Sequence, residues 1–368
     1  MNNPIYVTKP ILPPIQEFVS YLHEIWESNI LTNNAALHQR LEQSLCEYFN
    51  WKNASLFTNG HIALEIALKS LDLKPGGEII TTPFTFVSTT AAIVNQGFIP
   101  VFCDIGDDFT INAAKTESLI TENTVAVLPV HVYGFPCDVE KLRDIAEKYN
   151  LKIIYDAAHA LGVKYKGEDI ASYGDVSMFS FHATKLFHTV EGGALVYTDS
   201  DMRRDIELNK NFGISGPESV ELIGMNGKMN EFQAAMGLSL LKYMDYIIEK
   251  RRHIHDRYMQ NLKDMERIKL PKISAQVDYN YAYMPALIEN HRDKVFKGLA
   301  ESNIYARKYF YPCISEIDCY KKYLRGNAMP KAVNIAEQII TLPIYPTLEL
   351  SEVDRICRVI CEIFKKGV

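Results

Sequence analysis

Residues 124–156 read TVAVLPVHVYGFPCDVEKLRDIAEKYNLKIIYD and contain two apolar β-type runs on either side of a helical stretch. The runs at 124–132 and 151–156 are rich in Val and Ile, whereas 139–149 has apolar residues at helical spacing. A strand, a helix and a strand in this order indicate a parallel crossover unit. The segment therefore predicts an α/β fold with a mostly parallel central sheet between helices.

The same alternation continues on both sides of this segment. The expected β-type runs are 55–58, 78–82, 99–105 and two within 172–198, and the expected helices are 15–30, 36–48, 61–71, 88–96 and 230–262. From about residue 275, short β-type runs and a helix at 353–364 indicate a smaller α+β lobe. We expect a large α/β domain over residues 1–245, including the N-terminal helices, and a smaller C-terminal α+β domain over 246–368.

Composition narrows the classes of function. The chain has 368 residues, 47% of them hydrophobic, and a net charge of −6 without clustered positive charge, which argues against nucleic-acid and membrane surfaces. Its seven cysteines are an odd number without a Cys-x-x-Cys pair, so neither a disulfide framework nor a metal site is indicated. No cationic leader opens the chain and no run of about 18 apolar residues occurs, so we expect a cytoplasmic protein.

Polar loops follow the predicted strands. In an open α/β sheet, the ligand site lies at the carboxyl ends of the strands. The loops expected there are TNGH at 58–61, PFTF at 83–86, HVYGFP at 131–136 and DAAH at 156–159. We therefore expect these four loops to build the site.

Three features in these loops carry chemistry. Lys185 lies between two predicted strands, where partial desolvation favours an uncharged, nucleophilic amine, although a lone lysine is more often a solvated surface residue. Asp156 ends a buried strand, where a carboxylate needs a cationic partner; its alternative role is a helix N-cap. Gly60 follows Asn59 at a strand-to-helix join, where free N–H groups bind phosphate, although Asn-Gly also serves turn geometry alone. An aldehyde cofactor that shuttles amino groups needs such a lysine, carboxylate and phosphate cradle.

The order and spacing of the motifs extend this interpretation to nearly the whole chain. The matching segments are Asn59–Leu64, Thr81–Phe86, Val130–Gly134, Asp156–His159, Ser180–Lys185, Glu191–Ala194 and Asn230–Ala235. Together they resemble the DegT/DnrJ/EryC1/StrS family of sugar aminotransferases. The resemblance implies the fold of the fold-type I enzymes that depend on pyridoxal 5'-phosphate (PLP).

The resemblance also implies roles for individual residues. Lys185 matches the lysine that forms a Schiff base with the cofactor, and Asp156 matches the carboxylate on its pyridine nitrogen. Further cofactor contacts are implied for the backbone at Gly60 and His61, the ring of Phe86, the imidazole of His159, the hydroxyl of Ser180 and, from the neighbouring subunit, Asn226. Substrate contacts are implied for Phe84, His182, Arg307, Tyr309 and Tyr311.

Two positions depart from the family pattern. The family more often has Thr or Ser at the position of His61. Histidine lacks that hydroxyl donor, so only the backbone contacts are expected at this position. The usual tripeptide Asn-Tyr-Arg reads Asn226-Gly227-Lys228 here. The loop at Asn226 implies a homodimer with shared active sites, because in the family it reaches the phosphate bound by the partner subunit.

The implied activity is transfer of an amino group from L-glutamate to a nucleotide-linked keto sugar. The run His182–Gly193 resembles members that aminate C4 of dTDP-4-keto-6-deoxyglucose to give dTDP-4-amino-4,6-dideoxyglucose, and bacterial O-antigen synthesis or an antibiotic deoxysugar pathway is the implied setting. Amination at C3 and formation of the galacto epimer stay open. A dehydratase or a non-catalytic regulatory member is disfavoured, because the dehydratases have histidine in place of Lys185, and a regulatory member is expected to lack Lys185 or Asp156.

Overall fold

The computed structural model describes residues 3–365 and centres on a seven-stranded sheet with the order β2-β10-β9-β6-β5-β3-β4. The strands are β2 (Ala54–Phe57), β3 (Glu78–Thr81), β4 (Ile99–Phe102), β5 (Thr124–Leu128), β6 (Lys152–Asp156), β9 (Val176–Ser180) and β10 (Gly193–Tyr197). The strands from β4 to β9 run parallel, whereas β10 pairs antiparallel with both β9 and β2. The predicted α/β fold with a mostly parallel sheet is therefore confirmed.

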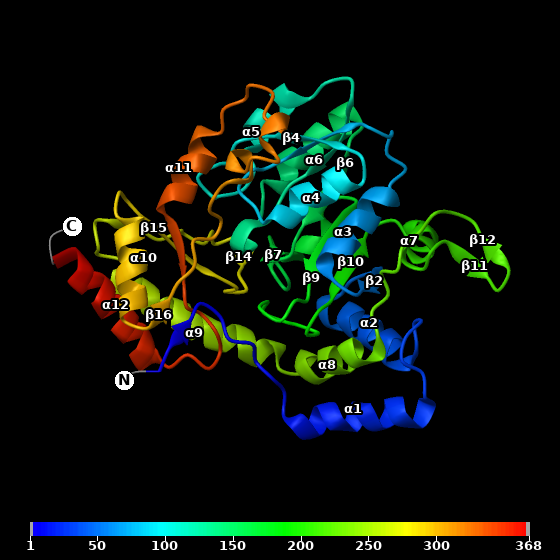
Figure 1. The fold of residues 1–368 in the computed structure, drawn as a ribbon, viewed down its shortest axis with the longest axis horizontal. Coiled ribbons are helices and arrows are strands. Elements are labelled where there is room, and N and C mark those ends of the chain that lie inside the picture. The colour runs from blue at the N-terminus through cyan, green and yellow to red at the C-terminus, as the bar shows by residue number, and fades with distance from the viewer. Residues whose placement is uncertain (1–2, 366–368) are drawn as a thin grey trace.

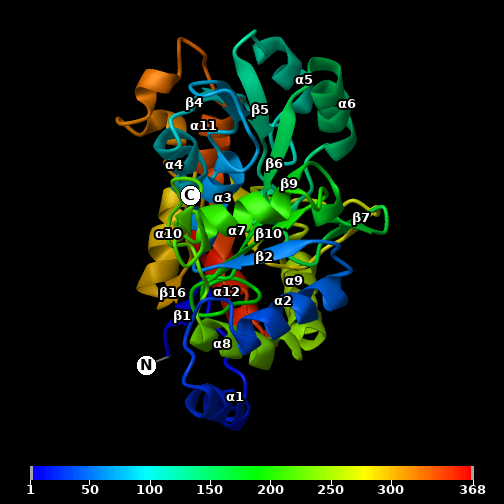
Figure 2. The ribbon, with the colours of Figure 1, turned by 90° about the vertical axis from the view of Figure 1, so that its right-hand side faces the viewer.

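Helices cover both faces of this sheet (Figures 1 and 2). They are α2 (Ala36–Phe49), α3 (Gly60–Lys69), α4 (Val87–Asn95), α5 (Ala113–Thr116), α6 (Val139–Tyr149), α7 (Met202–Lys210) and α8 (Glu231–Leu241). Neighbouring residues of one strand enter different cores, since Ile153 of β6 packs with α2 and α6 while Ile154 packs with α3 and α4. Burial on both faces explains why these strands are continuous apolar runs rather than alternating ones.

The C-terminal part forms a smaller lobe around its own hydrophobic core. Its elements are α9 (Met244–Leu262), the antiparallel strands β13 (Ile268–Lys269), β15 (Met284–Ile288) and β17 (Ile339–Leu342), and the helices α10 (Arg292–Glu301), α11 (Pro330–Gln338) and α12 (Leu350–Lys365). We propose that the boundary between the two domains falls after residue 245, in the first turn of α9. One N-terminal strand crosses it, because β1 (Ile5–Tyr6) pairs with β16 (Ile304–Tyr305).

Two elements stand out from the body of the molecule (Figure 1). The helix α1 (Ile15–Ser28) lies below α8 and contacts it through Trp26, whose ring meets the edge of Phe232. A hairpin of β11 (Ile214–Gly216) and β12 (Ser219–Val220) projects beyond α7. A small sheet of β7 (Lys164–Tyr165), β8 (Glu168–Asp169) and β14 (Val277–Asp278) joins the two parts. None of the helices within residues 3–365 combines the length and apolar character needed to cross a membrane.

A buried histidine makes the stability of this fold depend on pH. His131 is fully buried, and its Nδ1 accepts a hydrogen bond from the backbone N–H of Cys137 at 3.0 Å. Burial lowers the pKa of His131 to about 3. The unfolded chain therefore takes up a proton below pH 6.5 that the folded chain excludes until about pH 3, so the free energy of unfolding falls as pH falls through this window.

We expect His131 to contribute about 2 kcal/mol to the loss of stability between pH 7 and pH 5. Urea unfolding at these two pH values measures the loss. His131→Asn keeps an acceptor for Cys137 but cannot titrate, so the loss should be smaller by this amount in the variant. An equal loss in both proteins would contradict the assignment.

Candidate active site

A cavity of about 430 Å³ opens at the carboxyl ends of β6 and β9 and beside the first turns of α3 and α4. Residues of three expected loops line it: Asn59, Gly60 and His61; Thr85 and Phe86; and Asp156, Ala158 and His159. The loop 131–136 does not line this cavity. Instead the backbone N–H of Tyr133 donates to Nδ1 of His159 at 3.0 Å, so this loop supports a residue of the cavity wall from behind.

Asp156 lies at the end of β6, inside the cavity wall and only 5% exposed. Its carboxylate accepts hydrogen bonds from the Thr89 hydroxyl at 2.7 Å and from the Ala158 N–H at 3.1 Å. Burial raises the pKa of Asp156, and these hydrogen bonds together with the charge of Lys185 offset this only in part. A cation placed against the carboxylate would stabilise its ionised form. No helix begins at Asp156, so the alternative role of helix N-cap is wrong.

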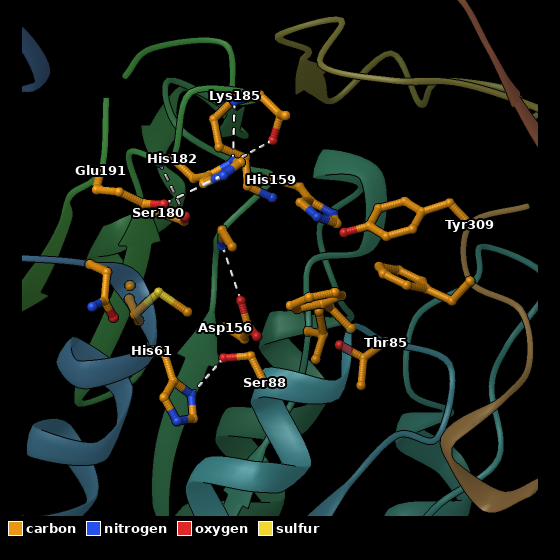
Figure 3. Close-up of a pocket in the computed structure, with 18 of the residues that line it drawn as sticks. His61, Thr85, Ser88, Asp156, His159, Ser180, His182, Lys185, Glu191 and Tyr309 are labelled. Carbon is orange, nitrogen blue, oxygen red and sulfur yellow. Dashed lines mark hydrogen bonds and ion pairs between the residues drawn. The ribbon is translucent and has the colours of Figure 1, made fainter. Parts of the chain in front are cut away.

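Lys185 lies across the cavity from Asp156, in the turn between β9 and β10 (Figure 3). Its backbone N–H donates to the carbonyl of His182 at 2.8 Å, which closes a tight turn and directs the side chain inward. The amine donates a hydrogen bond to the hydroxyl of Tyr283 at 3.3 Å. The positive charge of Lys185 acts to lower the pKa of both Asp156 and His159. The amine and the carboxylate thus belong to one site.

The first turn of α3 forms a cradle next to Ser180. Asn59 caps the helix by accepting from the N–H of Ile62 at 2.9 Å, and the earlier N–H groups have no acceptor within a helix. The space here is narrow: a Cβ on Gly60 would lie 3.1 Å from the Ser180 side chain, and a Cβ on Gly193 would lie only 2.7 Å from the backbone of Gly60, so glycine is required at position 193. Free N–H groups beside a hydroxyl, in a space free of side chains, suit a phosphate group.

We expect Gly193→Ala to weaken cofactor binding by about 10-fold or more. Its methyl group has to push the first turn of α3 away from β10, and a shift of this kind typically costs about 1–3 kcal/mol. Gly298→Ala is the matched control, since a Cβ there is similarly crowded, 2.6 Å from the Ile363 side chain, but lies in α10 of the smaller lobe. Fluorescence titration with PLP measures both affinities, and unchanged affinity in Gly193→Ala would refute the cradle.

His61 lines the cavity but is held by two neighbours. Its Nδ1 lies 2.8 Å from the Ser88 hydroxyl, and its Nε2 lies 3.2 Å from the carboxylate of Glu65. Glu65 accepts only, so Nε2 carries a proton in this arrangement. Because both ring nitrogens are engaged, the imidazole has no free donor for a phosphate, and a contact through the backbone N–H of position 61 stays a prediction.

Aromatic rings form the wall opposite Ser180 (Figure 3). His159 is buried, and burial, with the charges of Lys185 and Arg307, lowers its pKa well below the usual range, so the imidazole is neutral. Its ring centroid lies 5.8 Å from that of Tyr309. The Arg307 guanidinium stacks on Tyr309, 4.5 Å from its ring centre. Phe86 is 47% exposed although it lines the cavity, so its ring is free to stack on a bound group.

His182 also lines the cavity, beside Lys185. Its Nδ1 lies 2.7 Å from the Thr184 hydroxyl and its Nε2 lies 3.6 Å from the carboxylate of Glu191. His182 and Glu191 are both about half exposed, so they form a polar rim at the mouth of the cavity.

Three residues expected at the site lie away from this cavity. Phe84 is fully buried among Phe109, Tyr133 and Phe310. Tyr311 points to the smaller lobe, where the Arg292 guanidinium lies 4.4 Å from its ring centre. Asn226 pairs with Asn211 through the backbone. Roles of these three residues in binding remain predictions.

The structure adds residues that the sequence motifs did not single out. Thr89 lies in the first turn of α4, and its hydroxyl is held by that of Thr85 at 2.8 Å. The motif Thr81–Phe86 ends three residues before Thr89. Thr89 itself lies in a predicted helix, and nothing in the sequence indicated that its hydroxyl binds Asp156. Tyr283 comes from the smaller lobe, more than 90 residues beyond Lys185, and no local pattern could indicate their contact.

These residues fit PLP. The buried carboxylate of Asp156 can hold a pyridinium, the cradle at Gly60 and Ser180 can hold a phosphate, and the Lys185 amine can bind an aldehyde. All of them line one cavity. This set of groups can support chemistry at the α-carbon of an amino acid.

Comparisons with known proteins agree with this geometry. Residues 14–361 match the DegT/DnrJ/EryC1/StrS aminotransferase family. The chain is 43% identical to a dTDP-4-amino-4,6-dideoxy-D-glucose transaminase of Shigella dysenteriae, over 99% of this chain and 100% of the relative. It is 40% identical to a protein of the same name from Escherichia coli, over 97% and 98% of the two chains. A GDP-perosamine synthase of Vibrio cholerae is 30% identical over 94% and 95%.

Solved structures give the same result. DesI, in the presence of its TDP-sugar product, superposes with a TM-score of 0.93 at 28% identity, covering 100% of this chain and 94% of that one. The sugar aminotransferase Spr1654 of Streptococcus pneumoniae in its PLP form, described as putative, gives 0.90 at 26% identity, covering 98% and 100%. The chain therefore belongs to the DegT/DnrJ/EryC1/StrS aminotransferase family, whose fold and PLP cofactor it shares.

Proposed function

We propose that this protein transfers the amino group of L-glutamate to C4 of dTDP-4-keto-6-deoxyglucose and so forms dTDP-4-amino-4,6-dideoxyglucose. The observation that carries the proposal is the single cavity that holds Lys185, Asp156 and the cradle at Gly60. The 43% and 40% identical relatives, both named for this amino sugar, support the choice of acceptor. Amination at C3 and formation of the galacto epimer would follow the same mechanism, and analysis of the product distinguishes them from the proposed reaction.

In this mechanism Lys185 has two tasks. It would hold PLP through its amine, and the same amine, when free, would take up and give back the proton of the α-carbon of the amino donor. When bound, PLP supplies the electron sink for the charge that develops at that carbon. Asp156 would hold the positively charged ring nitrogen and so stabilise this developing charge. His159 is neutral and buried, and its Nδ1 accepts from the Tyr133 N–H, so its Nε2 carries the proton and can donate a hydrogen bond without adding charge.

Each substrate has candidate partners in the cavity. The guanidinium of Arg307 suits a carboxylate or a phosphate, because its fork of N–H groups binds both in a bidentate manner. Tyr309 offers a ring and a hydroxyl beside it, and His182 lies at the rim. We propose that Arg307, Tyr309 and His182 bind substrate.

We propose that two copies of the chain form a homodimer with shared active sites. Asn226 lies outside its own cavity, and the hairpin nearby exposes Ile214, Val220 and Ile223, of which Ile223 is 87% exposed. Covering these side chains with a second copy would remove apolar surface from water. If sites are shared, a mixture of Lys185→Ala and Asn226→Ala subunits recovers activity that neither variant has alone. A fully active monomer in sedimentation would contradict the proposal.

We propose a cytoplasmic setting and a role in bacterial surface-glycan synthesis, such as that of the O-antigen. All seven cysteines are free thiols, as in proteins of reducing compartments.

The visible spectrum of the PLP-loaded protein tests the proposed reaction. L-Glutamate should remove the absorption band of the lysine-bound cofactor, and dTDP-4-keto-6-deoxyglucose should restore it. L-Aspartate serves as the control donor and should act more slowly. A band that glutamate does not change would refute the donor. A band that glutamate removes and this sugar fails to restore would refute the acceptor.

A further inference from the structure

Within residues 3–365 the amine of Lys185 hydrogen-bonds to one side chain, which comes from the smaller lobe. The Tyr283 hydroxyl accepts its hydrogen bond at 3.3 Å, and the amine also lies 5.9 Å from the centre of the Tyr283 ring. Tyr283 directly precedes β15, whereas Lys185 lies between β9 and β10 of the central sheet. The contact therefore joins the two parts of the molecule at the most reactive side chain of the site.

The segment that carries Tyr283 is fixed from two sides. Asn280 donates to the carbonyls of His159 and Leu161 at 2.9 and 3.0 Å, which ties it to the loop after β6. The buried guanidinium of Arg251 donates to the carbonyls of Ala282 and Ile344, both at 3.1 Å, which ties it to the smaller lobe. With the backbone on both sides of Tyr283 anchored, its hydroxyl occupies a defined place relative to His159.

The ring of Tyr283 is fixed as well. It packs against His159, with 4.5 Å between ring centroids, and stacks on Tyr309 at 5.7 Å with 23° between the planes. Burial and then the neighbouring Tyr283 phenol raise the pKa of Tyr309 well above its usual value, so Tyr309 is a neutral phenol beside it. A lysine ammonium has three N–H donors and no acceptor, so Tyr283 must accept from it through oxygen.

We infer that Tyr283 is a positioning residue for Lys185: its hydroxyl binds the amine, directs it toward the cavity and stabilises the form of Lys185 that carries the transferred proton. The inference rests on the proposed role of Lys185 in proton transfer. A freed lysine side chain has four rotatable bonds, and a hydrogen bond to a fixed acceptor reduces the range of positions it adopts. The proton never passes to Tyr283, which only accepts a hydrogen bond from the Lys185 amine.

Tyr283→Phe removes this acceptor and retains the ring that packs on His159 and Tyr309. We expect kcat to fall about 10-fold, which is the effect of losing one hydrogen bond to a charged group, with KM for L-glutamate changed less than about two-fold. A loss of packing alone would not separate kcat from KM in this way.

A second readout reports the amine directly. Cofactor-free protein recaptures PLP through the uncharged amine, so the recapture rate rises with pH, and its midpoint marks the loss of the proton from Lys185. Removing the Tyr283 acceptor destabilises the charged amine, so the midpoint should move about 0.5–1 pH unit lower. The other ionisable groups around the amine are the same in both proteins, namely Asp156, His159, His182, Glu191, Arg307 and Tyr309.

Tyr281→Phe is the matched control. Tyr281 lies two residues away, and its ring packs against His255 and Tyr279, whereas the contacts of the Lys185 amine are with Tyr283. It should keep the kcat and the pH midpoint of the unmodified protein. If Tyr283→Phe folds poorly, 4-fluorophenylalanine at position 283 fills the space of the hydroxyl but is a much weaker acceptor, and it should lower the midpoint as Tyr283→Phe does.

Unchanged kcat and midpoint in the Tyr283 variant, or an equal change in Tyr281→Phe, would overturn the inference. The role of Lys185 itself is tested separately, by the turnover of Lys185→Ala and Lys185→Arg. A Tyr283 variant that behaves like the unmodified protein leaves the role of Lys185 intact and rejects only the role of Tyr283.

Discussion

Lys185→Ala is expected to lower kcat by about 10⁴-fold or more and to abolish the visible band of lysine-bound PLP. The variant loses the covalent anchor and the proton carrier together, and positioned acid–base catalysis alone contributes about 10²–10⁴-fold. The structure supports this size of effect, because the amine is placed in the same cavity as Asp156 and the phosphate cradle. Steady-state turnover with L-glutamate and the keto sugar, together with a spectrum, measures both losses.

Two control variants sharpen this experiment. Lys185→Arg keeps a positive charge but has no primary amine, so it should be as inactive as the alanine variant. Lys250→Ala removes an exposed lysine of α9 that lies over the ring of Tyr246, and it should keep full activity. Near-normal turnover in Lys185→Arg would show that only the charge matters and would reject the proposed mechanism.

Asp156→Asn is expected to lower kcat by about 10²–10³-fold while the protein stays folded. The amide has nearly the same shape: its oxygen can still accept from the Ala158 N–H, and its NH2 group can donate to the Thr89 hydroxyl, but it cannot hold a positive charge on the ring nitrogen. Removing one preorganised electrostatic contact of this kind typically has an effect of this size. The effect should fall mainly on kcat, because it concerns charge that develops only during the reaction.

Asp169→Asn is the matched control for Asp156. Asp169 is also a buried carboxylate whose pKa is raised by burial, and it accepts hydrogen bonds from Trp51 and Ala171 far from the cavity. This variant should lose some thermal stability and keep its kcat. If both variants lost activity equally, the effect of Asp156 would be one of folding and not of charge.

The sequence predicted the sheet and most of the site because both depend on local patterns. Buried parallel strands are short apolar runs, and Asp156 is recognisable as the polar residue that ends one of them. Gly60 follows a strand and opens a helix, so its place at a phosphate cradle can be inferred from the neighbouring residues alone.

Contacts between distant segments could not be predicted in this way. Tyr283 meets Lys185 across two lobes, and Ile5 pairs with Ile304 although almost the whole chain separates them. The antiparallel direction of β10 depends on the turn that carries Lys185 and not on any residue pattern in the strand. Phe84 illustrates the opposite problem. It lies in a motif that matches the family, yet its ring is buried in a hydrophobic core and does not line the cavity.

Identification of the product is the most direct test of the proposed function. The PLP-loaded protein is incubated with L-glutamate and dTDP-4-keto-6-deoxyglucose, and the product is analysed by mass spectrometry and proton NMR. We predict one equivalent of 2-oxoglutarate and a sugar with its amino group at C4 in the gluco configuration, shown by large couplings of H4 to H3 and to H5. An amino group at C3, a small H3–H4 coupling typical of the galacto epimer, or no amino sugar at all would contradict it.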